Sequence, residues 1–351
     1  TVFNSMEQVK ALIPKKKQGT QYAVMCEVVN PLPLDMLAPA DEDSADIIRV
    51  IVWKTKRNAD GEKVDALQEG YDYCKGIVEK GYKLCVQPAR VSQYSDAEFV
   101  SMVKMFSELN PMAIYVVDSW GTENAESLLH YMHLADDNMP AHIALGYHGH
   151  NNMMQALGVS QAMIQENFSR DIMIDASVYG IGRGAGNLNL ELIIDYLNRY
   201  FGKSYIVAPA FELDKKYIRP IFHKEPWGYS EAYALSAKYN CNPAFARYFS
   251  LSLNLPADEI EGIFASLQQD EKVVYSELAA LELVRRYRRA KWAKKLAVIV
   301  PTANRSESIH YLLEKNSKHY SSFGIDLIIY DSSSDDKTEL ITKKYMRYKG
   351  S

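Results

Sequence analysis

The sequence lacks the features that mark three large classes of proteins. No apolar run approaches about 18 residues, so we expect no transmembrane helix. The start has no charged segment followed by an apolar core, which argues against a signal peptide. The formal net charge of -4 argues against a dedicated nucleic-acid-binding protein, because neutralising phosphates requires a net basic surface. We therefore expect a cytoplasmic protein, with peripheral membrane contact as the alternative for the basic stretch at residues 282–295.

Closely spaced cysteine pairs are also missing. The four cysteines (Cys26, Cys74, Cys85 and Cys241) form no C-x-x-C pattern, so we expect reduced core residues without a zinc site or a disulfide framework. The 351 residues contain 47% hydrophobic and 24% charged residues, values that are typical of a globular protein with two domains or one enlarged barrel. The first residue is not Met, which suggests a piece of a longer protein.

Short apolar runs recur along the chain with helical patterns between them. Their starts lie roughly 25 to 35 residues apart, the length of one βα unit, and they do not alternate cleanly, as expected for buried parallel strands. The runs are residues 22–28, 47–53, 82–87, 113–118, 142–147 and 172–177. Six consecutive units predict a (β/α)₈ TIM barrel that lacks its first strands.

Two of the intervening helices carry clear boundary signals. Ser95 and Glu98 form a capping box, which predicts a helix that starts after Ser95. A second helix is predicted from the apolar stripe within residues 190–201, and Gly202 follows where a C-terminal cap belongs.

Polar residues follow the last three predicted strands. Asp118 ends one strand, the segment Gly146-Tyr-His-Gly-His-Asn-Asn152 ends the next, and Asp175 lies in the third. Because strand side chains alternate, His148 and His150 should point to the same side, where two imidazoles can bind one divalent ion. The alternative is a pair of packed or solvated histidines.

A glycine-rich turn follows Asp175 at residues 180–187. It fits no dinucleotide-binding G-x-G-x-x-G register. Directly before a helix, such a turn can expose backbone N–H groups that hold an anion, which makes Gly182 and Gly184 candidates for substrate binding. Gln87 and Arg90, at the end of an earlier strand, are further candidates for substrate contact.

Together, D-S-x-G, G-x-H-x-H-N-N, D-A-S and G-x-G-x-G-x-G-N resemble the motifs of the metal-dependent aldolase and lyase barrels. This family includes 4-hydroxy-2-oxovalerate aldolase, 3-hydroxy-3-methylglutaryl-CoA lyase and the isopropylmalate and homocitrate synthases. The resemblance implies that His148 and His150 are metal ligands and that Asn187 completes the metal shell. The family's first-strand motif T-L-R-D-G, which supplies an aspartate ligand and an arginine, is absent from these residues, so the implied ligand set is incomplete.

The chemistry of this family passes through an enolate of a 2-oxo acid such as pyruvate. A divalent cation stabilises that charge as a Lewis acid, and Mn²⁺ or Mg²⁺ suits the implied ligands, with Zn²⁺ or Co²⁺ as alternatives. Asp118 could orient a ligand, meet the substrate or cap the following turn. The segment after Pro226 resembles the family's helical extension, which implies that Tyr229 or Tyr233 reaches the active site as a catalytic residue; aromatic packing is the alternative.

A second pattern begins at residue 296. V-I-V-P-T-x-N-R, a helix and a D-x-x-S-x-D-x-T loop resemble the start of family-two glycosyltransferases. The resemblance implies that Thr302 and Asp331 contact the nucleotide of a nucleotide sugar. It covers about 55 residues, and the sequence stops before that family's D-x-D motif, so we expect an incomplete half-fold here.

These observations predict three parts: an aldolase-like barrel over residues 1–204, a helical extension over residues 205–290 and a glycosyltransferase-like fragment over residues 291–351. The main hypothesis is a metal-dependent carbon–carbon lyase joined to a glycosyltransferase, in a context such as surface-polysaccharide synthesis. Two alternatives remain: the barrel is a non-catalytic binding or assembly module, or glycosyl transfer is the main activity. Family barrels are often dimeric, which makes a homodimer a further expectation.

Overall fold

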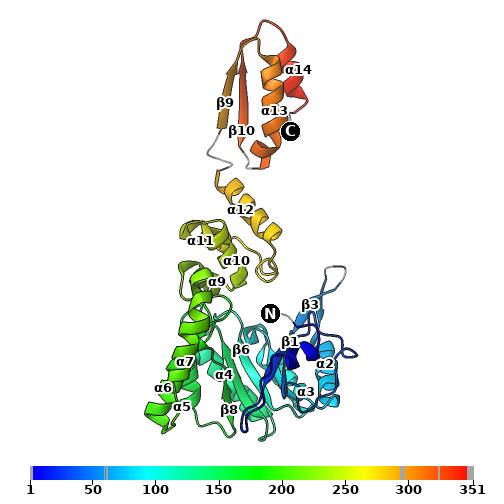
Figure 1. Cartoon of the computed structure of the whole chain (residues 1–351). Helices are drawn as coiled ribbons and strands as arrows, with labels where there is room; N and C mark the ends of the chain where they lie inside the picture. The colour runs from blue at the N-terminus through cyan, green and yellow to red at the C-terminus, as the bar shows by residue number, and fades with distance from the viewer. Residues whose placement is uncertain (1–2, 59, 61, 293–296, 323–324, 346–351) are drawn as a thin grey trace. The chain divides into compact units, whose positions relative to one another are not determined.

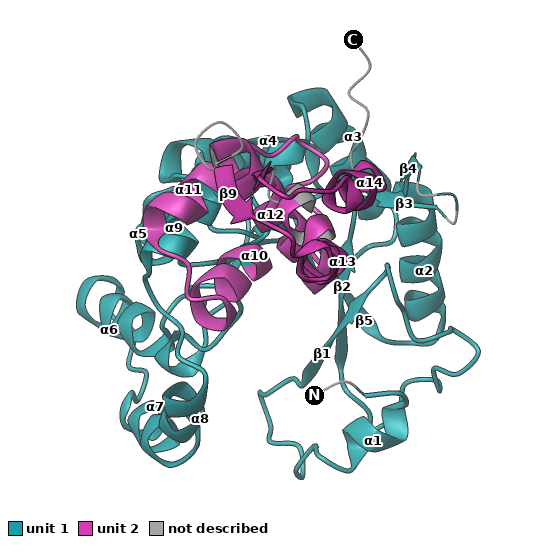
Figure 2. Cartoon of the chain, turned by 90° about the horizontal axis from the view of Figure 1, so that it is seen from above, with its two compact units in different colours: residues 1–243 teal, residues 244–351 magenta. Residues whose placement is uncertain are grey.

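The computed structural model describes residues 3–58, 60, 62–292, 297–322 and 325–345. The chain divides into two compact units, Thr1–Pro243 and Ala244–Ser351 (Figure 2). Within the described ranges, none of the helices is both long and apolar enough to cross a membrane.

Unit 1 is built on a parallel sheet with strands in the order β1-β2-β5-β6-β7-β8. Figure 1 labels β1, β6 and β8 of this sheet. The strands are β1 (Ala23–Glu27), β2 (Ile47–Val52), β5 (Lys83–Pro88), β6 (Ala113–Asp118), β7 (Ala144–Gly149) and β8 (Ile172–Ile174). Each lies within or beside one of the six predicted runs, which confirms the α/β fold class. β1 and β8 are the two edges, so the sheet in the described part of the chain is an open, partial barrel.

Helices connect successive strands from β2 to β8: α2 (Leu67–Glu79), α3 (Asp96–Ser107), α4 (Ala125–Asn138) and α5 (Ala156–Gln165). The helix α1 (Met6–Lys10) precedes β1, and α6 (Leu190–Phe201) follows β8. The predicted capping box is present at the start of α3, where Ser95 and Glu98 bond reciprocally to backbone amides. Gly202 ends α6 with a φ of 62°, the left-handed conformation expected of a C-terminal cap.

The sequence did not predict the antiparallel hairpin between β2 and α2. It consists of β3 (Thr55–Arg57) and β4 (Lys63–Asp65). Its strands are short, charged and largely exposed, so they lack the apolar run that identifies the buried strands.

The two faces of the sheet differ in character. On the outer face, residues of the central strands and of α2 to α5 form the main hydrophobic core, including Val50, Val86, Val116 and Tyr147. The inner face carries a smaller apolar group around Tyr115 and Cys85, next to polar side chains near the carboxyl ends of the strands. Successive residues of a strand alternate between these faces. The outer face is therefore apolar, whereas the inner face carries both apolar and polar side chains.

Beyond the sheet, short helical segments complete unit 1: η2 (Val178–Gly180), α7 (Ala208–Leu213), η3 (Asp214–Ile218), α8 (Arg219–Lys224) and α9 (Glu231–Lys238). A further short turn, η1 (Val91–Gln93), follows β5. The segments from α7 onward lie in the first part of the range predicted as a helical extension, residues 205–290, and the domain bounds stay predictions.

Unit 2 begins with helical segments and continues with a two-stranded parallel sheet. The helices are α10 (Pro243–Arg247), η4 (Tyr248–Ser252), α11 (Ala257–Ala265) and α12 (Glu277–Trp292). The sheet pairs β9 (Ala297–Thr302) with β10 (Asp326–Asp331), and the helices α13 (Ser306–Ser322) and α14 (Lys337–Lys343) follow the two strands. This β-α-β order is the one expected from the sequence, whereas the boundary after residue 290 stays a prediction.

The contact between Gly146 and Tyr115 gives a stability test of the inner face. The two residues are register partners on β7 and β6, and a Cβ on Gly146 would overlap the buried tyrosine ring. We expect Gly146→Ala to lower the free energy of unfolding by about 1–3 kcal/mol in urea denaturation, because the ring must shift. Gly158 in α5 is the matched control: its added Cβ would meet nothing within 4 Å, so Gly158→Ala should stabilise by about 0.5–1 kcal/mol. Equal stability of Gly146→Ala and the unmodified chain would contradict the packing described here.

Candidate metal and substrate site

The candidate site lies at the carboxyl ends of β7 and β8. Tyr147 packs into the outer core, so the next residue, His148, faces the inner side. The rings of His148 and His150 have centroids 5.2 Å apart at an interplanar angle of 77°. The two histidines therefore lie together, as the alternation of the strand predicts.

Asp175 fixes the orientation of His148. The Nδ1 atom of His148 donates to Oδ2 of Asp175 at 2.8 Å, and Arg49 forms an ion pair with the same oxygen. Burial alone would raise the pKa of Asp175, but the hydrogen bond from His148 and the positive charge of Arg49 outweigh it and hold the pKa below its ordinary value. With its Nδ1 proton committed to Asp175, His148 presents Nε2 as its free ring nitrogen.

Arg49 is a site residue that the sequence analysis missed. It lies on β2, contacts Asp175 and stands 5.1 Å from the centre of the Tyr115 ring. The Gln87 amide also contacts Arg49: its oxygen, turned to Arg49, accepts from Nε at 3.1 Å, and its expected contact with substrate stays a prediction. The signal for Arg49 was a single charged residue inside the apolar run of residues 47–52.

His150 is held by the glycine-rich turn. Its Nδ1 donates to the carbonyl oxygen of Arg183 at 3.1 Å, and its backbone forms an antiparallel bridge with Asn187. Burial, and then the neighbouring His148, lower the pKa of His150 to about 4, so this ring is neutral at pH 7. A neutral imidazole is the form that binds metal ions.

The turn also presents polar groups that lack protein partners. The side-chain nitrogen of Asn187 donates to the carbonyl oxygen of Ile181 at 3.1 Å, whereas its Oδ1 atom is buried without a hydrogen bond. Within the described residues, the backbone amides of Gly182 and Gly184 likewise show no hydrogen-bond acceptor. A buried polar atom without a partner is rare, so Oδ1 of Asn187 points to a bound ligand, whereas the two glycines are only half-buried and their amides can face solvent.

The donors present fit a divalent cation in part. The potential donors are Nε2 of His148, Nε2 of His150 and Oδ1 of Asn187, and a site with three protein ligands would leave open positions for substrate. Over the ranges that the structure describes, no group of three or more His, Cys, Asp or Glu side chains is arranged to hold a metal. The donor set is therefore nitrogen- and amide-based, without a carboxylate.

Asp118 lies on the other side of the strand ends. It is buried, and its two carboxylate oxygens accept from the backbone amides of Thr122 at 3.0 Å and Glu123 at 3.2 Å. These bonds cap the turn after β6, the structural alternative considered for this residue. Its predicted contact with substrate has no support in these bonds and stays a prediction.

The other predicted residues occupy different environments. Arg90 is buried beyond the end of β5, Tyr233 is buried in α9, and Tyr229 is 63% exposed just before that helix. Thr302 and Asp331 end β9 and β10 and are register partners in unit 2. The catalytic roles of the two tyrosines stay predictions.

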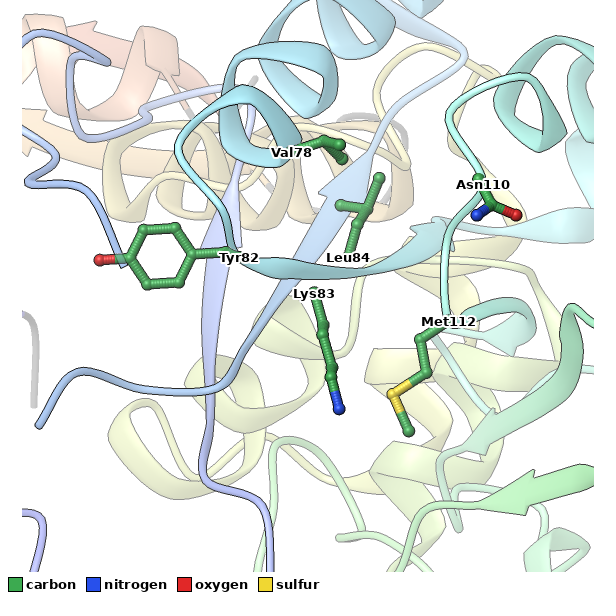
Figure 3. Close-up of a pocket in the computed structure, with 6 residues that line it drawn as sticks. All are labelled: Val78, Tyr82, Lys83, Leu84, Asn110 and Met112. Atoms are coloured by element: carbon green, nitrogen blue, oxygen red, sulfur yellow. The ribbon is translucent and has the colours of Figure 1, made fainter. Parts of the chain in front are cut away.

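A pocket of about 350 Å³ opens at the opposite end of the strands (Figure 3). Its lining includes Tyr82, Lys83 and Met112, which precede or begin β5 and β6. Parallel sheets carry their chemistry at the carboxyl ends, where the polar residues gather here. We therefore do not assign the site to this pocket.

Comparison with known proteins decides the family. The HMGL-like family profile matches residues 7–211. The chain belongs to the HMGL-like family. It is 28% identical over 193 residues to the 4-hydroxy-2-oxovalerate aldolase of Marinomonas sp. (strain MWYL1), covering 55% of this chain and 52% of that protein. The aldolase of Bacillus thuringiensis (strain Al Hakam) is 26% identical over 200 residues, with 57% and 53% covered. The chain thus spans about half the length of these curated relatives.

Solved structures show the same fold. The N-terminal domain of a candidate aldolase from Bacteroides vulgatus superposes with a TM-score of 0.54 at 21% identity, covering 71% of this chain and 77% of that one. The carboxyl transferase domain of Rhizobium etli pyruvate carboxylase, in its Y628A form with pyruvate, gives a TM-score of 0.53 at 10% identity, with 76% and 47% covered. At these identities the likeness concerns the fold alone.

The burial of Asp118 predicts a distinctive pH dependence of stability. Burial raises its pKa from 3.8 to about 7, despite the backbone hydrogen bonds. Between pH 3.8 and about 7, the folded chain therefore keeps a proton on Asp118 that the unfolded chain has lost. This proton contributes to the free energy of unfolding, and its contribution is lost as the pH rises through 7. We expect the stability difference between the unmodified chain and Asp118→Asn to shrink by on the order of 2 kcal/mol between pH 5 and pH 8. Urea denaturation at both pH values tests this, and a difference that does not change with pH would show that Asp118 is ionised throughout.

Proposed function

We propose that unit 1 is a divalent-metal-dependent carbon–carbon lyase of the aldolase type that acts on a 2-oxo acid. The observation that carries this proposal is the pair of His148 and His150 rings, 5.2 Å apart, each bonded through Nδ1, with Asn187 bridged to the His150 backbone and its Oδ1 buried without a hydrogen bond. Family membership and the names of the curated relatives, 4-hydroxy-2-oxovalerate aldolases, support the reaction class. Mn²⁺ or Mg²⁺ remains the favoured metal, with Zn²⁺ or Co²⁺ as alternatives.

The metal's contribution would be Lewis-acid stabilisation of the negative charge that develops on a 2-oxo acid during carbon–carbon cleavage. The chain's own residues would prepare this site. Asp175 holds the proton of His148 on Nδ1, and the carbonyl oxygen of Arg183 does the same for His150. Both rings are thereby fixed before any ligand binds, which lowers the entropic cost of binding.

Groups that suit an anionic substrate surround these donors. The amides of Gly182 and Gly184 lie in the turn that ends at Asn187, and each can donate to a carboxylate. Arg49 adds a guanidinium beside Asp175 and His148, and it keeps the Asp175 carboxylate ionised. Tyr229 and Tyr233 remain the proposed catalytic tyrosines, on the basis of the sequence resemblance.

The lyase proposal is tested by following pyruvate release from a 4-hydroxy-2-oxo acid. We expect release to depend on added Mn²⁺ and to fall by on the order of 100-fold or more in His148→Ala, because one of three ligands is removed. His130→Ala is the control, since this histidine lies on the exposed side of α4, where it pairs with Asp96 and borders the Tyr131 ring. Metal-independent release, or equal losses in both variants, would contradict the proposal.

For unit 2, we propose a nucleotide-binding half-fold of the glycosyltransferase type. Support comes from the Oγ1 atom of Thr302, which is buried without a hydrogen bond at the end of β9, directly beside Asp331 on β10. The two following loops are joined, because Asn304 Oδ1 accepts from the backbone amide of Ser334 at 3.0 Å. A glycosyl-transfer activity as the main function, with unit 1 as a binding module, is the competing proposal.

Uridine diphosphate is a suitable probe of this second proposal. We expect Thr302→Val to weaken its binding about tenfold in calorimetric titration, since one neutral hydrogen bond is worth about 1.5 kcal/mol at most. Thr338→Val is the matched control, because its hydroxyl is equally buried and unpartnered but lies on α14 instead of a strand end. Equal affinities of the unmodified chain and both variants would remove the support from Thr302.

A further inference from the structure

Arg90 is a buried cation held only by neutral groups. It is 3% exposed, directly follows β5 and has a left-handed backbone with a φ of 54°. Its Nη2 donates to Oδ1 of Asn240 at 3.3 Å, and the Gln93 amide oxygen, turned toward it, accepts from Nη2 at 3.0 Å and Nε at 3.3 Å. The guanidinium carbon stands 3.5 Å from the centre of the Trp120 ring.

A comparison with Arg170 shows what Arg90 lacks. The side chain of Arg170 is 2% exposed and forms an ion pair with Asp136 at 2.5 Å. In the described part of the chain, no Asp or Glu side chain pairs with Arg90, and burial lowers the pKa of its guanidinium to about 10. A buried charge without a counter-ion lowers the stability of the folded chain. An anion bound beside the Arg90 guanidinium would supply that counter-ion.

The surroundings of Arg90 connect it to the histidine site. Its backbone amide donates to Oγ of Ser119 at 3.0 Å, in the loop that follows β6. Two residues later in that loop, Gly121 lies so close to the His150–Asn152 backbone that an added Cβ would come within 2.7 Å of the His150 carbonyl oxygen. A single loop therefore separates Arg90 from the donors of the candidate metal site.

We propose that Arg90 is the centre of an anion subsite that takes a carboxylate or phosphate group of a ligand. Its planar fork suits either oxyanion, and the Trp120 face and the Asn240 and Gln93 amides fix its orientation. This proposal has an extension that rests on the proposed lyase function: Arg90 would favour substrates with a second anionic group, distant from the 2-oxo acid end. The subsite itself does not depend on that function.

Thermal unfolding of the full chain tests the subsite without metal or catalysis. We expect inorganic phosphate or malonate to raise the unfolding midpoint by about 3 °C over chloride at equal ionic strength, and comparison of the two anions separates phosphate from carboxylate preference. This gain should disappear in Arg90→Met, which keeps the length of the side chain without its charge. Arg90→Lys should retain part of it.

Asn240→Asp supplies a second, independent variant. It places a carboxylate where the Asn240 oxygen already contacts Arg90, so it should raise the midpoint in chloride and abolish the response to phosphate and malonate. Equal anion responses in the unmodified chain and Arg90→Met would overturn the proposal. If Arg90→Met fails to fold, Asn240→Asp alone decides. The proposal is overturned if Asn240→Asp lowers the midpoint in chloride and the variant still responds to phosphate and malonate.

Substrate kinetics test the extension separately. With 4-hydroxy-2-oxo acids, Arg90→Met should raise KM about tenfold for a substrate with a second carboxylate and leave KM unchanged for one with an uncharged end. Equal KM changes for the two substrates would refute the role in substrate choice. An absence of lyase activity in the unmodified chain, together with the predicted anion response, would refute the lyase function and retain the subsite.

Discussion

The Asp175 carboxylate is the interaction on which the candidate site depends. One oxygen receives the proton of His148 from β7 and the guanidinium of Arg49 from β2, while the backbone amide of Asp175 donates to the carbonyl oxygen of Tyr147 at 3.0 Å. The side chains of His148, Asp175 and Arg49 thereby satisfy one another on the inner face of the sheet, where the neighbouring positions are apolar. Removing the carboxylate would free the His148 ring and leave the Arg49 charge without its partner, so the orientation of the histidine and the stability of the inner face are coupled.

A second constraint brings the glycine-rich turn to this cluster. The buried Asn152 accepts from the amide of Ala185 at 3.1 Å, and its side-chain nitrogen reaches Ser236 of α9 at 3.4 Å. Gly184 must lack a side chain here, since a Cβ would come within 2.7 Å of the Asn152 oxygen. The same turn then delivers the Arg183 carbonyl oxygen to His150 and the Asn187 amide to the candidate metal site, which explains why so many glycines and asparagines occur together.

The parts of this arrangement that follow regular periodicities were predictable from the sequence. The six strands and the pairing of His148 with His150 follow from apolar runs and strand alternation, and the capping box at Ser95 marked a helix start. Arg49 was not identified, because a charged residue in an apolar run has no partner until the fold brings residue 175 next to it. Turn capping was one of three roles left open for Asp118, because residue type alone does not show which face of the sheet a side chain occupies. The charged hairpin β3–β4 lacked the apolar pattern altogether.

The central claim is that His148, His150 and Asn187 hold a divalent cation. Pulsed electron paramagnetic resonance of Mn²⁺ bound to the chain measures this most directly, because nitrogen ligands produce ¹⁴N couplings to the metal. The account predicts one bound Mn²⁺ per chain with coupling to two imidazoles, reduced to one imidazole in His150→Gln. A Mn²⁺ spectrum without nitrogen coupling, or one that is the same in that variant, would contradict it.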